Sequence, residues 1–244
     1  MSTARESGSP APQAQGRFAV YWAPEASHPL WAAGCAWLGR DPSAPPAPAA
    51  LPRAHVAAPA RYGFHATLQA PMRLAEGVSL ADLRGAVAAL AARQHAFAMP
   101  ALEVAWLHDF LALRPVQAPA PAHPLRQLAD ACVRQLDALR ARPAAAELAR
   151  RTRDGGLDDA QQALLARWGY PHVFDHWRFH MTLSERFGER STPDAERFAQ
   201  AAKQWFEASL AQPLRGASVC IFHEAAAGAP FQLIERMALR TEAA

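Results

Sequence analysis

Hydrophobic residues recur along the chain with two different spacings, which separate strands from helices. Runs rich in β-branched and aromatic residues, or alternating in polarity, predict strands at 17–23, 61–71, 101–107, 110–113, 177–187, 217–223 and 231–239. Apolar residues three and four positions apart predict helices at 27–38, 79–93, 123–139, 158–168 and 193–210, with further helix to about 153. Ser27 and Ser79 are expected to cap two of these helices, and Gly169 to end a third.

The predicted elements form a repeat. Segments 61–115 and 177–240 have the same order of strand, helix, strand and strand, and a helical insertion of about 122–169 separates them. We therefore expect one bilobal domain over 17–244, with two similar lobes related by an approximate two-fold axis. Residues 1–16 are expected to form a disordered tail, and the Pro- and Ala-rich stretch 41–60 a surface loop.

Composition narrows the class of protein. Half of the 244 residues are hydrophobic, as in globular proteins, but no apolar run approaches the roughly 20 residues that span a bilayer, so no membrane partner is expected. The three cysteines have neither disulfide nor metal-ligand spacing, which favours a cytoplasmic location. The net charge is +3, but Lys203 is the only lysine and no basic cluster occurs, so DNA is not an expected partner.

A Phe-His-x-Thr-Leu motif begins each segment, and its two copies lie at 64–68 and 179–183. Residues i and i+2 of a strand point to the same face. Each copy is therefore expected to present one imidazole and one hydroxyl on one face, His65 with Thr67 and His180 with Thr182. The intervening apolar residues would face a core.

Two imidazoles and two hydroxyls around one site suit in-line displacement at phosphorus. One neutral histidine can remove a proton from the attacking group while the other, protonated, donates to the leaving oxygen. The threonine hydroxyls would stabilise the charge that gathers on the non-bridging oxygens. Because histidine titrates near pH 6.5, we expect a bell-shaped pH profile near neutrality. Which histidine is acid and which is base stays open, as does the direction, hydrolysis or ligation.

The segments RYGFHATLQAPMRL, FLALRP, LLARWGYPHVFDHWRFHMTLS and WLGRD resemble the two-histidine (2H) phosphoesterase superfamily, and within it a branch of bacterial proteins associated with phosphonate-utilisation operons. The resemblance runs from about residue 17 to the last strand. It implies a bilobal α+β fold with antiparallel sheets and packed helices around a central cleft. It also implies a phosphodiester or cyclic-phosphate substrate, small and nucleotide-like or an RNA end, with no metal and no cofactor.

The resemblance assigns the catalytic set to His65, Thr67, His180 and Thr182. Relatives often carry Lys at the position of Gln69, which implies a weaker role for Gln69 in binding substrate charge. Other candidates for substrate binding follow from the strand pattern or from side-chain chemistry, although each is more simply explained as an ordinary surface or core residue: Arg61, Tyr62, Tyr170, Arg178 and Ser184.

Two rival functions remain open. His172, His176 and His180 are spaced by four, and on a helix they would share a face and could bind the metal of a metal-dependent hydrolase. Pro171 and the run Trp-Arg-Phe favour an extended segment instead. The second rival is a non-catalytic module that binds RNA or a nucleotide. The sequence indicates no oligomeric state.

Overall fold

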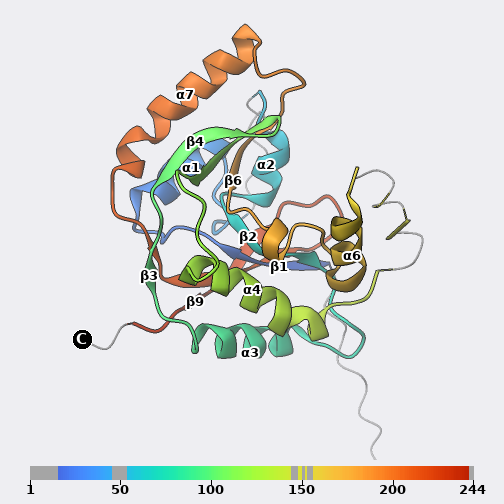
Figure 1. Cartoon of the computed structure of the whole chain (residues 1–244). Helices are drawn as coiled ribbons and strands as arrows, with labels where there is room; N and C mark the ends of the chain where they lie inside the picture. The colour runs from blue at the N-terminus through green and yellow to red at the C-terminus, as the bar shows by residue number, and fades with distance from the viewer. Residues whose placement is uncertain (1–15, 46–53, 144–147, 150–151, 153–155, 242–244) are drawn as a thin grey trace, which may run out of the picture.

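The computed structural model describes residues 16–45, 54–143, 148–149, 152 and 156–241. Within this part of the chain an antiparallel sheet has the strand order β4-β5-β6-β2-β1-β8-β9 (Figure 1). The strands are β1 (Arg17–Trp22), β2 (Ala66–Met72), β4 (Leu102–Leu107), β5 (Phe110–Pro115), β6 (Met181–Arg186), β8 (Ser218–Glu224) and β9 (Gln232–Ala238). Two short strands, β3 (Phe97–Ala98) and β7 (Arg215–Gly216), pair separately. The expected α+β class is confirmed.

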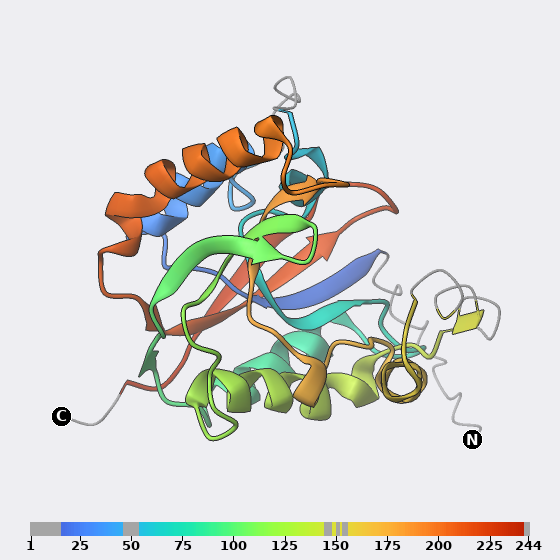
Figure 2. The same cartoon turned by 45° about the horizontal axis from the view of Figure 1, so that its top comes forward.

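Helices cover the sheet at its two ends, as Figure 2 shows. The helix α3 packs on β8, β9 and α4, and α4 also packs on β2, whereas α7 packs on β4 and α1. The helices are α1 (Pro29–Leu38), α2 (Ala57–Tyr62), α3 (Leu80–Ala91), α4 (Pro124–Leu136), α6 (Asp159–Trp168) and α7 (Pro193–Leu210), with short 3₁₀ turns at Asp137–Leu139 and Phe174–His176. None of the described helices is long and apolar enough to span a membrane.

The repeated order of elements is present, but the two repeats exchange their hairpins. β2 is followed by α3, β4 and β5, and β6 is followed by α7, β8 and β9. In the sheet, however, β5 pairs with β6, and β8 joins the other half through β1, next to β2. Each half of the sheet therefore combines a motif strand from one repeat with the hairpin of the other. The two motif strands become central neighbours.

Local signals placed most helix ends correctly. Ser79 caps α3 with a capping box, and Gly169 ends α6 at φ 73°. The expected cap at Ser27 is wrong. His28 occupies this position instead, because its Nδ1 accepts a hydrogen bond from the backbone N–H of Leu30 (3.1 Å) and Pro29 suits the first helical turn.

Both motif strands begin later than the sequence pattern predicts. The stretch before His65 is not a strand, because α2 occupies it until Gly63, at φ 83°, turns the chain. Likewise 177–180 precede β6 and follow a 3₁₀ turn. α2 also shows that the predicted loop 41–60 contains helix at its end. Residues 1–15 and 46–53, and most of 144–155, lie outside the described residues.

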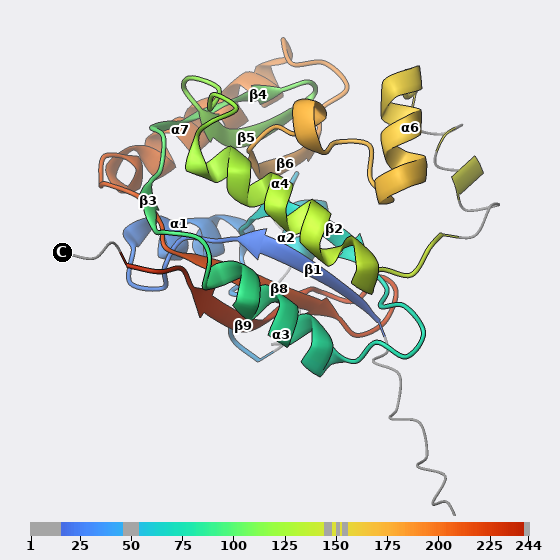
Figure 3. The ribbon, with the colours of Figure 1, turned by 60° about the horizontal axis from the view of Figure 1, so that its bottom comes forward.

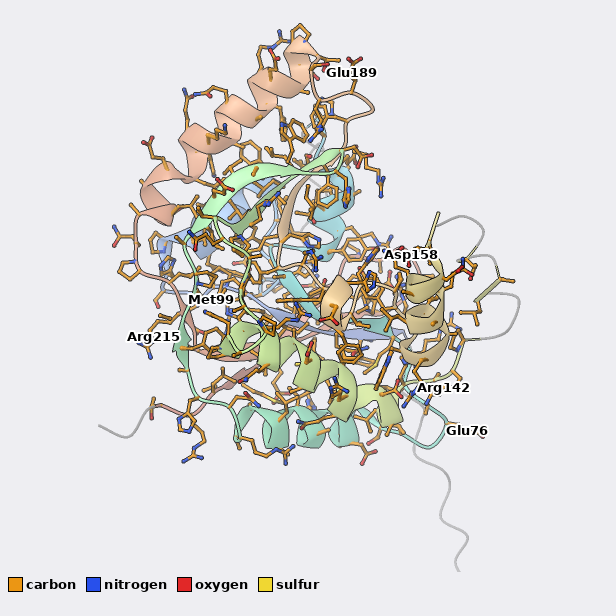
Figure 4. The ribbon with its side chains drawn as sticks, viewed as in Figure 1. Glu76, Met99, Arg142, Asp158, Glu189 and Arg215 are labelled. Atoms are coloured by element: carbon orange, nitrogen blue, oxygen red, sulfur yellow. The ribbon has the colours of Figure 1, made fainter. Side chains whose placement is uncertain are left out.

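α6 brings the end of the insertion to the sheet. Asp158 and Arg142 lie near its opposite ends, as Figure 4 shows. Asp158 caps the N-terminus, and Arg142 donates from Nη1 to the carbonyl of Arg167 (3.0 Å) in the last turn. Both charges suit the helix dipole. α6 is thus held where Gly169 can turn the chain and direct Tyr170 towards the motif strands.

Candidate active site

The two histidines occupy equivalent places immediately before the motif strands. β2 and β6 meet at one antiparallel pair, Ala66 with Met181. α4 packs on β2 and lies in front of it in the view of Figure 3. Continuing this register by one residue in each direction sets each histidine opposite the threonine of the other motif, His65 with Thr182 and His180 with Thr67. Directly opposed side chains have Cβ atoms about 5 Å apart, and the diagonal pair of histidines about 7–8 Å.

Each imidazole is oriented by a backbone carbonyl. Nδ1 of His65 lies 2.9 Å from the carbonyl oxygen of Gly63, and Nδ1 of His180 lies 2.8 Å from that of Arg178. A carbonyl can only accept, so Nδ1 must carry the proton in both rings. Nε2 is then the nitrogen that gains or loses a proton. The Thr67 hydroxyl lies 3.4 Å from Nε2 of His65.

The surroundings favour the neutral form of both rings. Burial lowers the pKa of His65 to about 4; its hydrogen bond to Gly63 opposes this, and the charge of His180 adds to it. Burial also lowers the pKa of His180, opposed by its bond to Arg178 and reinforced by His172 and His108. Both pKa values therefore lie below the ordinary value of a histidine side chain.

A polar cavity of about 290 Å³ opens beside the motif, lined by Arg17, Tyr21, Tyr62, His65, Thr67, Ala70, Pro71, Gly169, Tyr170 and Thr182. A second, apolar cavity of about 480 Å³ is lined by Ala58, Pro59, Tyr62, Gly63, His65, Phe110, Thr182, Ser184, Glu185 and Arg186. The two share Tyr62, His65 and Thr182. His180 lines neither, but its ring lies 5.7 Å from that of Phe110, in the wall of the apolar cavity. A ligand at His65 can therefore extend in two directions, one polar and one apolar.

Tyr21 is a site residue that the sequence did not single out. Its ring stacks on His65 with centroids 3.7 Å apart, and it lies opposite Thr67 in the sheet. Tyr21 is fully buried, and it covers the face of the imidazole that water would otherwise reach. Nothing in the pattern of β1 distinguishes this aromatic residue from a core residue, because its role depends on which strand lies alongside.

Gln69 stands two residues after Thr67 but does not share the face of His65 and Thr67. The register between β1 and β2 shifts, so Tyr21 pairs with Thr67 while Val20 pairs with Gln69. Tyr21 and Val20 are adjacent and face opposite sides, so their partners do so too. Gln69 is consequently buried away from the cavities, and Ala70 lines the polar one in its place.

The two arginine candidates do not line the polar cavity. Arg61 lies on α2, not on a strand in phase with His65, and its guanidinium pairs with Glu224 and donates to the carbonyl of Ala229. Arg178 is exposed and donates from Nη1 to the carbonyls of Asp175 and Trp177. It lines a separate cavity with Arg114 and Arg126, among others. Neither guanidinium is placed as the strand pattern predicted.

Ser184 has a structural role, whereas the two candidate tyrosines line the cavities. The Ser184 hydroxyl donates to the carbonyl of Glu185 (2.7 Å) and accepts from the backbone N–H of Leu111 (2.8 Å), where the β5–β6 register is irregular. The Ser184 hydroxyl thus replaces a backbone hydrogen bond that is missing between β5 and β6, although Ser184 also borders the apolar cavity. Tyr62 stacks on Phe231 (5.2 Å) between the cavities, and burial raises the pKa of Tyr170 at the wall of the polar one.

The histidines of the metal-dependent rival do not share a helical face. Only His176 belongs to the 3₁₀ turn, and His180 follows it in extended chain. In the described parts of the chain no three His, Cys, Asp or Glu side chains converge as a group that could hold a metal ion. The absence of a metal requirement stays a prediction.

Comparison with known proteins gives two kinds of relative. Ribose 1,5-bisphosphate phosphokinase PhnN of Janthinobacterium sp. (strain Marseille) is 39% identical over 225 residues, covering 88% of this chain and 49% of its own length. The protein of the same name from Laribacter hongkongensis (strain HLHK9) is 41% identical over 224 residues, covering 89% and 50%. The chain thus spans about half the length of these curated relatives.

Among solved structures, E. coli LigT complexed with NADP+ has a TM-score of 0.43 at 17% identity, covering 92% of this chain and 98% of LigT. A structure described as a phosphoesterase has a TM-score of 0.42 at 18% identity, with the same coverages. The family model described as "Protein of unknown function (DUF1045)" matches residues 67–232, from the first motif threonine to the last strand. Because this match covers more than half of its length, the chain belongs to the DUF1045 family.

Proposed function

We propose that this protein is a phosphodiesterase of the two-histidine type, which cleaves a phosphodiester or cyclic phosphate without a metal ion. The observation that carries the proposal is the pairing of the two motif strands at Ala66 and Met181, whose register sets each histidine opposite the other motif's threonine. Of these four side chains, a single cavity is lined by His65, Thr67 and Thr182. Both imidazoles have Nδ1 committed to a carbonyl and Nε2 available. Two such groups are what general acid–base catalysis at phosphorus requires.

His65 acts as the base in this proposal, because burial lowers its pKa to about 4 and the ring of Tyr21 stacks on it, so that its imidazole stays neutral. Its Nε2 takes a proton from water as the new O–P bond forms. The P–O bond to the leaving group breaks, and the leaving oxygen takes the proton from Nε2 of His180. A bound phosphate carries negative charge, which raises the pKa of a neighbouring imidazole and so favours the protonated His180. Exchange of protons with water resets the pair.

The threonines act on the non-bridging oxygens. Thr67 and Thr182 lie on the strands that directly follow the two histidines, so their hydroxyls come from both sides of the β2–β6 seam. Charge accumulates on these oxygens in the transition state, and hydroxyl donors stabilise it. Because they sit on paired strands, the hydroxyls need little reorganisation.

The kinase named in the curated relatives is not explained by this segment. A P-loop requires the pattern G-x-x-x-x-G-K followed by Ser or Thr. The chain's only lysine, Lys203, stands between Ala202 and Gln204. We therefore assign the kinase name to the remaining half of those longer proteins, and the phosphodiesterase activity to the half that this chain resembles. The resemblance to proteins of phosphonate-utilisation operons suggests a sugar phosphate in that metabolism as substrate.

The test is hydrolysis of a cyclic phosphodiester, such as adenosine 2′,3′-cyclic phosphate, by purified protein with and without EDTA. Turnover that EDTA leaves unchanged supports the proposal. Loss of turnover that a divalent ion restores would establish a metal-dependent hydrolase. Binding of the cyclic nucleotide without any turnover would indicate the non-catalytic nucleotide-binding module.

A further inference from the structure

Two partly exposed arginines and one buried glutamate form a cluster, and one of the arginines, Arg17, lines the polar cavity. Glu224 is fully buried and accepts hydrogen bonds from Nε of Arg17, Nη2 of Arg61 and the backbone N–H of Gly228. Burial alone would raise the pKa of Glu224, but the bonds from both arginines outweigh it and hold the pKa at about 2. The carboxylate is therefore ionised near neutral pH, and the cluster carries a net charge of +1.

The uncompensated charge is accessible at Arg17. Its side chain is 30% exposed, and only Nε is bonded to Glu224. Among the described residues no hydrogen-bond partner is found for its terminal nitrogens. Arg17 is also the one Arg, Lys, Asp or Glu among the described residues that line the polar cavity. A positive group with spare donors thus faces a cavity that lacks a carboxylate.

Strand geometry fixes the position of Arg17 relative to the histidines. Arg17 and Tyr21 are four residues apart on β1 and share a face, and Tyr21 stacks on His65. The Cα atoms of Arg17 and Tyr21 are about 13 Å apart at the usual rise per residue. Because the arginine side chain is long, its guanidinium can lie closer to His65 than this Cα distance. Tyr62 and Tyr170 line the same cavity as Arg17 and His65. Beyond Arg17 a cavity of about 420 Å³ continues past Arg73.

We propose that Arg17 forms a second anion subsite and that the substrate is a phosphodiester carrying an additional phosphate monoester. This inference rests on the proposed function for the identity of the reacting group. The reacting phosphodiester lies at His65, a sugar spans the tyrosines, and the monoester meets the terminal nitrogens of Arg17. Guanidinium groups bind phosphate through two parallel hydrogen bonds, which a single net positive charge reinforces.

The experiment uses two probes that differ by one phosphate: adenosine 2′,3′-cyclic phosphate and its 5′-phosphorylated form. For the unaltered protein we expect kcat/KM to be roughly 10–100-fold higher for the 5′-phosphorylated probe, as charge-assisted hydrogen bonds imply. Arg17→Gln should abolish the preference between the two probes. Arg17→Lys should keep part of it, because the charge stays and the planar fork is lost.

Arg84→Gln is the matched control, because Arg84 pairs with Glu235 and lines neither cavity of the active site. It should keep the full preference. If Arg17→Gln fails to fold, salt provides the readout on the unaltered protein: the preference should fall as NaCl rises, since screening weakens the added ionic contact. A preference that is absent, or that survives both Arg17→Gln and high salt, overturns the subsite.

Failure of the proposed function would look different. If neither probe is hydrolysed, the phosphodiesterase assignment fails, and calorimetric binding of the same two probes still tests the subsite. Tighter binding of the 5′-phosphorylated probe that Arg17→Gln removes would uphold the subsite without the reaction. Equal binding of both probes would reject it.

Discussion

The two motif regions share four residue types in the same order, but their surroundings differ. His65 lies between β1 and β6, and the ring of Tyr21 stacks on it at 3.7 Å. His180 has the tilted ring of Phe110 at 5.7 Å, with His172 and His108 near enough to affect its pKa. The comparison teaches that the repeat provides two equivalent proton carriers, whereas neighbours from other strands make them unequal. Unequal pKa values are what separate an acid from a base.

The sharpest way to break this comparison is to remove each imidazole in turn. His65→Ala and His180→Ala should each lower kcat/KM by about 10²–10⁴ on a cyclic phosphodiester, since each removes one proton transfer. On a p-nitrophenyl phosphodiester the leaving group departs without a proton. The loss should then shrink for His180→Ala and persist for His65→Ala.

Steady-state kinetics of both variants on both substrates measures this difference. His176→Ala is the control, and it should retain full activity because His176 lines neither cavity of the site. The opposite pattern of losses would exchange the acid and base roles. Equal losses on both substrates would show that the two rings are not specialised.

The threonine substitutions are expected to have the next largest effect on the rate. Thr67→Ala and Thr182→Ala should each lower kcat by about 10–10³, as removal of one donor to a developing charge does. Thr67→Ser and Thr182→Ser keep the hydroxyl and should recover most of the rate. Rates for all four variants would test this, and serine variants as impaired as the alanine variants would point to lost packing.

The pH dependence of kcat/KM tests the difference between the surroundings of His65 and His180. Because kcat/KM reports the free enzyme, its bell should have an acid limb near pH 4, set by His65, and a basic limb below pH 6.5, set by His180. Tyr21→Ser admits water to the His65 ring, so the pKa of His65 should rise and the acid limb should move up by about one pH unit. Tyr21→Phe keeps the ring and should leave the limb in place. An unaltered protein with both limbs above pH 6.5 would contradict the assignment.

The smallest effect on catalysis is expected at Ser184. Ser184→Ala leaves the buried N–H of Leu111 without its acceptor, which should cost about 1–3 kcal/mol in the free energy of unfolding. Its kcat/KM should change by less than about threefold, within the range of residues that do not act on the transition state. Urea denaturation and kinetics together measure both quantities, with the exposed Ser191→Ala as control. A large loss of rate with unchanged stability would return Ser184 to the catalytic set.

The sequence by itself determined the elements with strong local signals. Hydrophobic spacing and end signals placed α3, α6 and α7 to within a few residues, because capping side chains and terminal glycines act within one turn of the helix. The repeated motif also predicted which side chains flank the β2–β6 seam, since side-chain direction in a strand follows from position alone.

The tertiary structure decided what depends on a partner strand. The register shift between β1 and β2 places the Gln69 side chain in the core. Arg61 does not share the face of His65, because it lies on the helix α2. Tyr21 became a site residue only because β1 lies next to β2. These outcomes share one physical reason: register, hairpin exchange and burial arise from contacts between residues far apart in the chain. Local periodicity has no information about such contacts, so it could locate the histidines but not make them different.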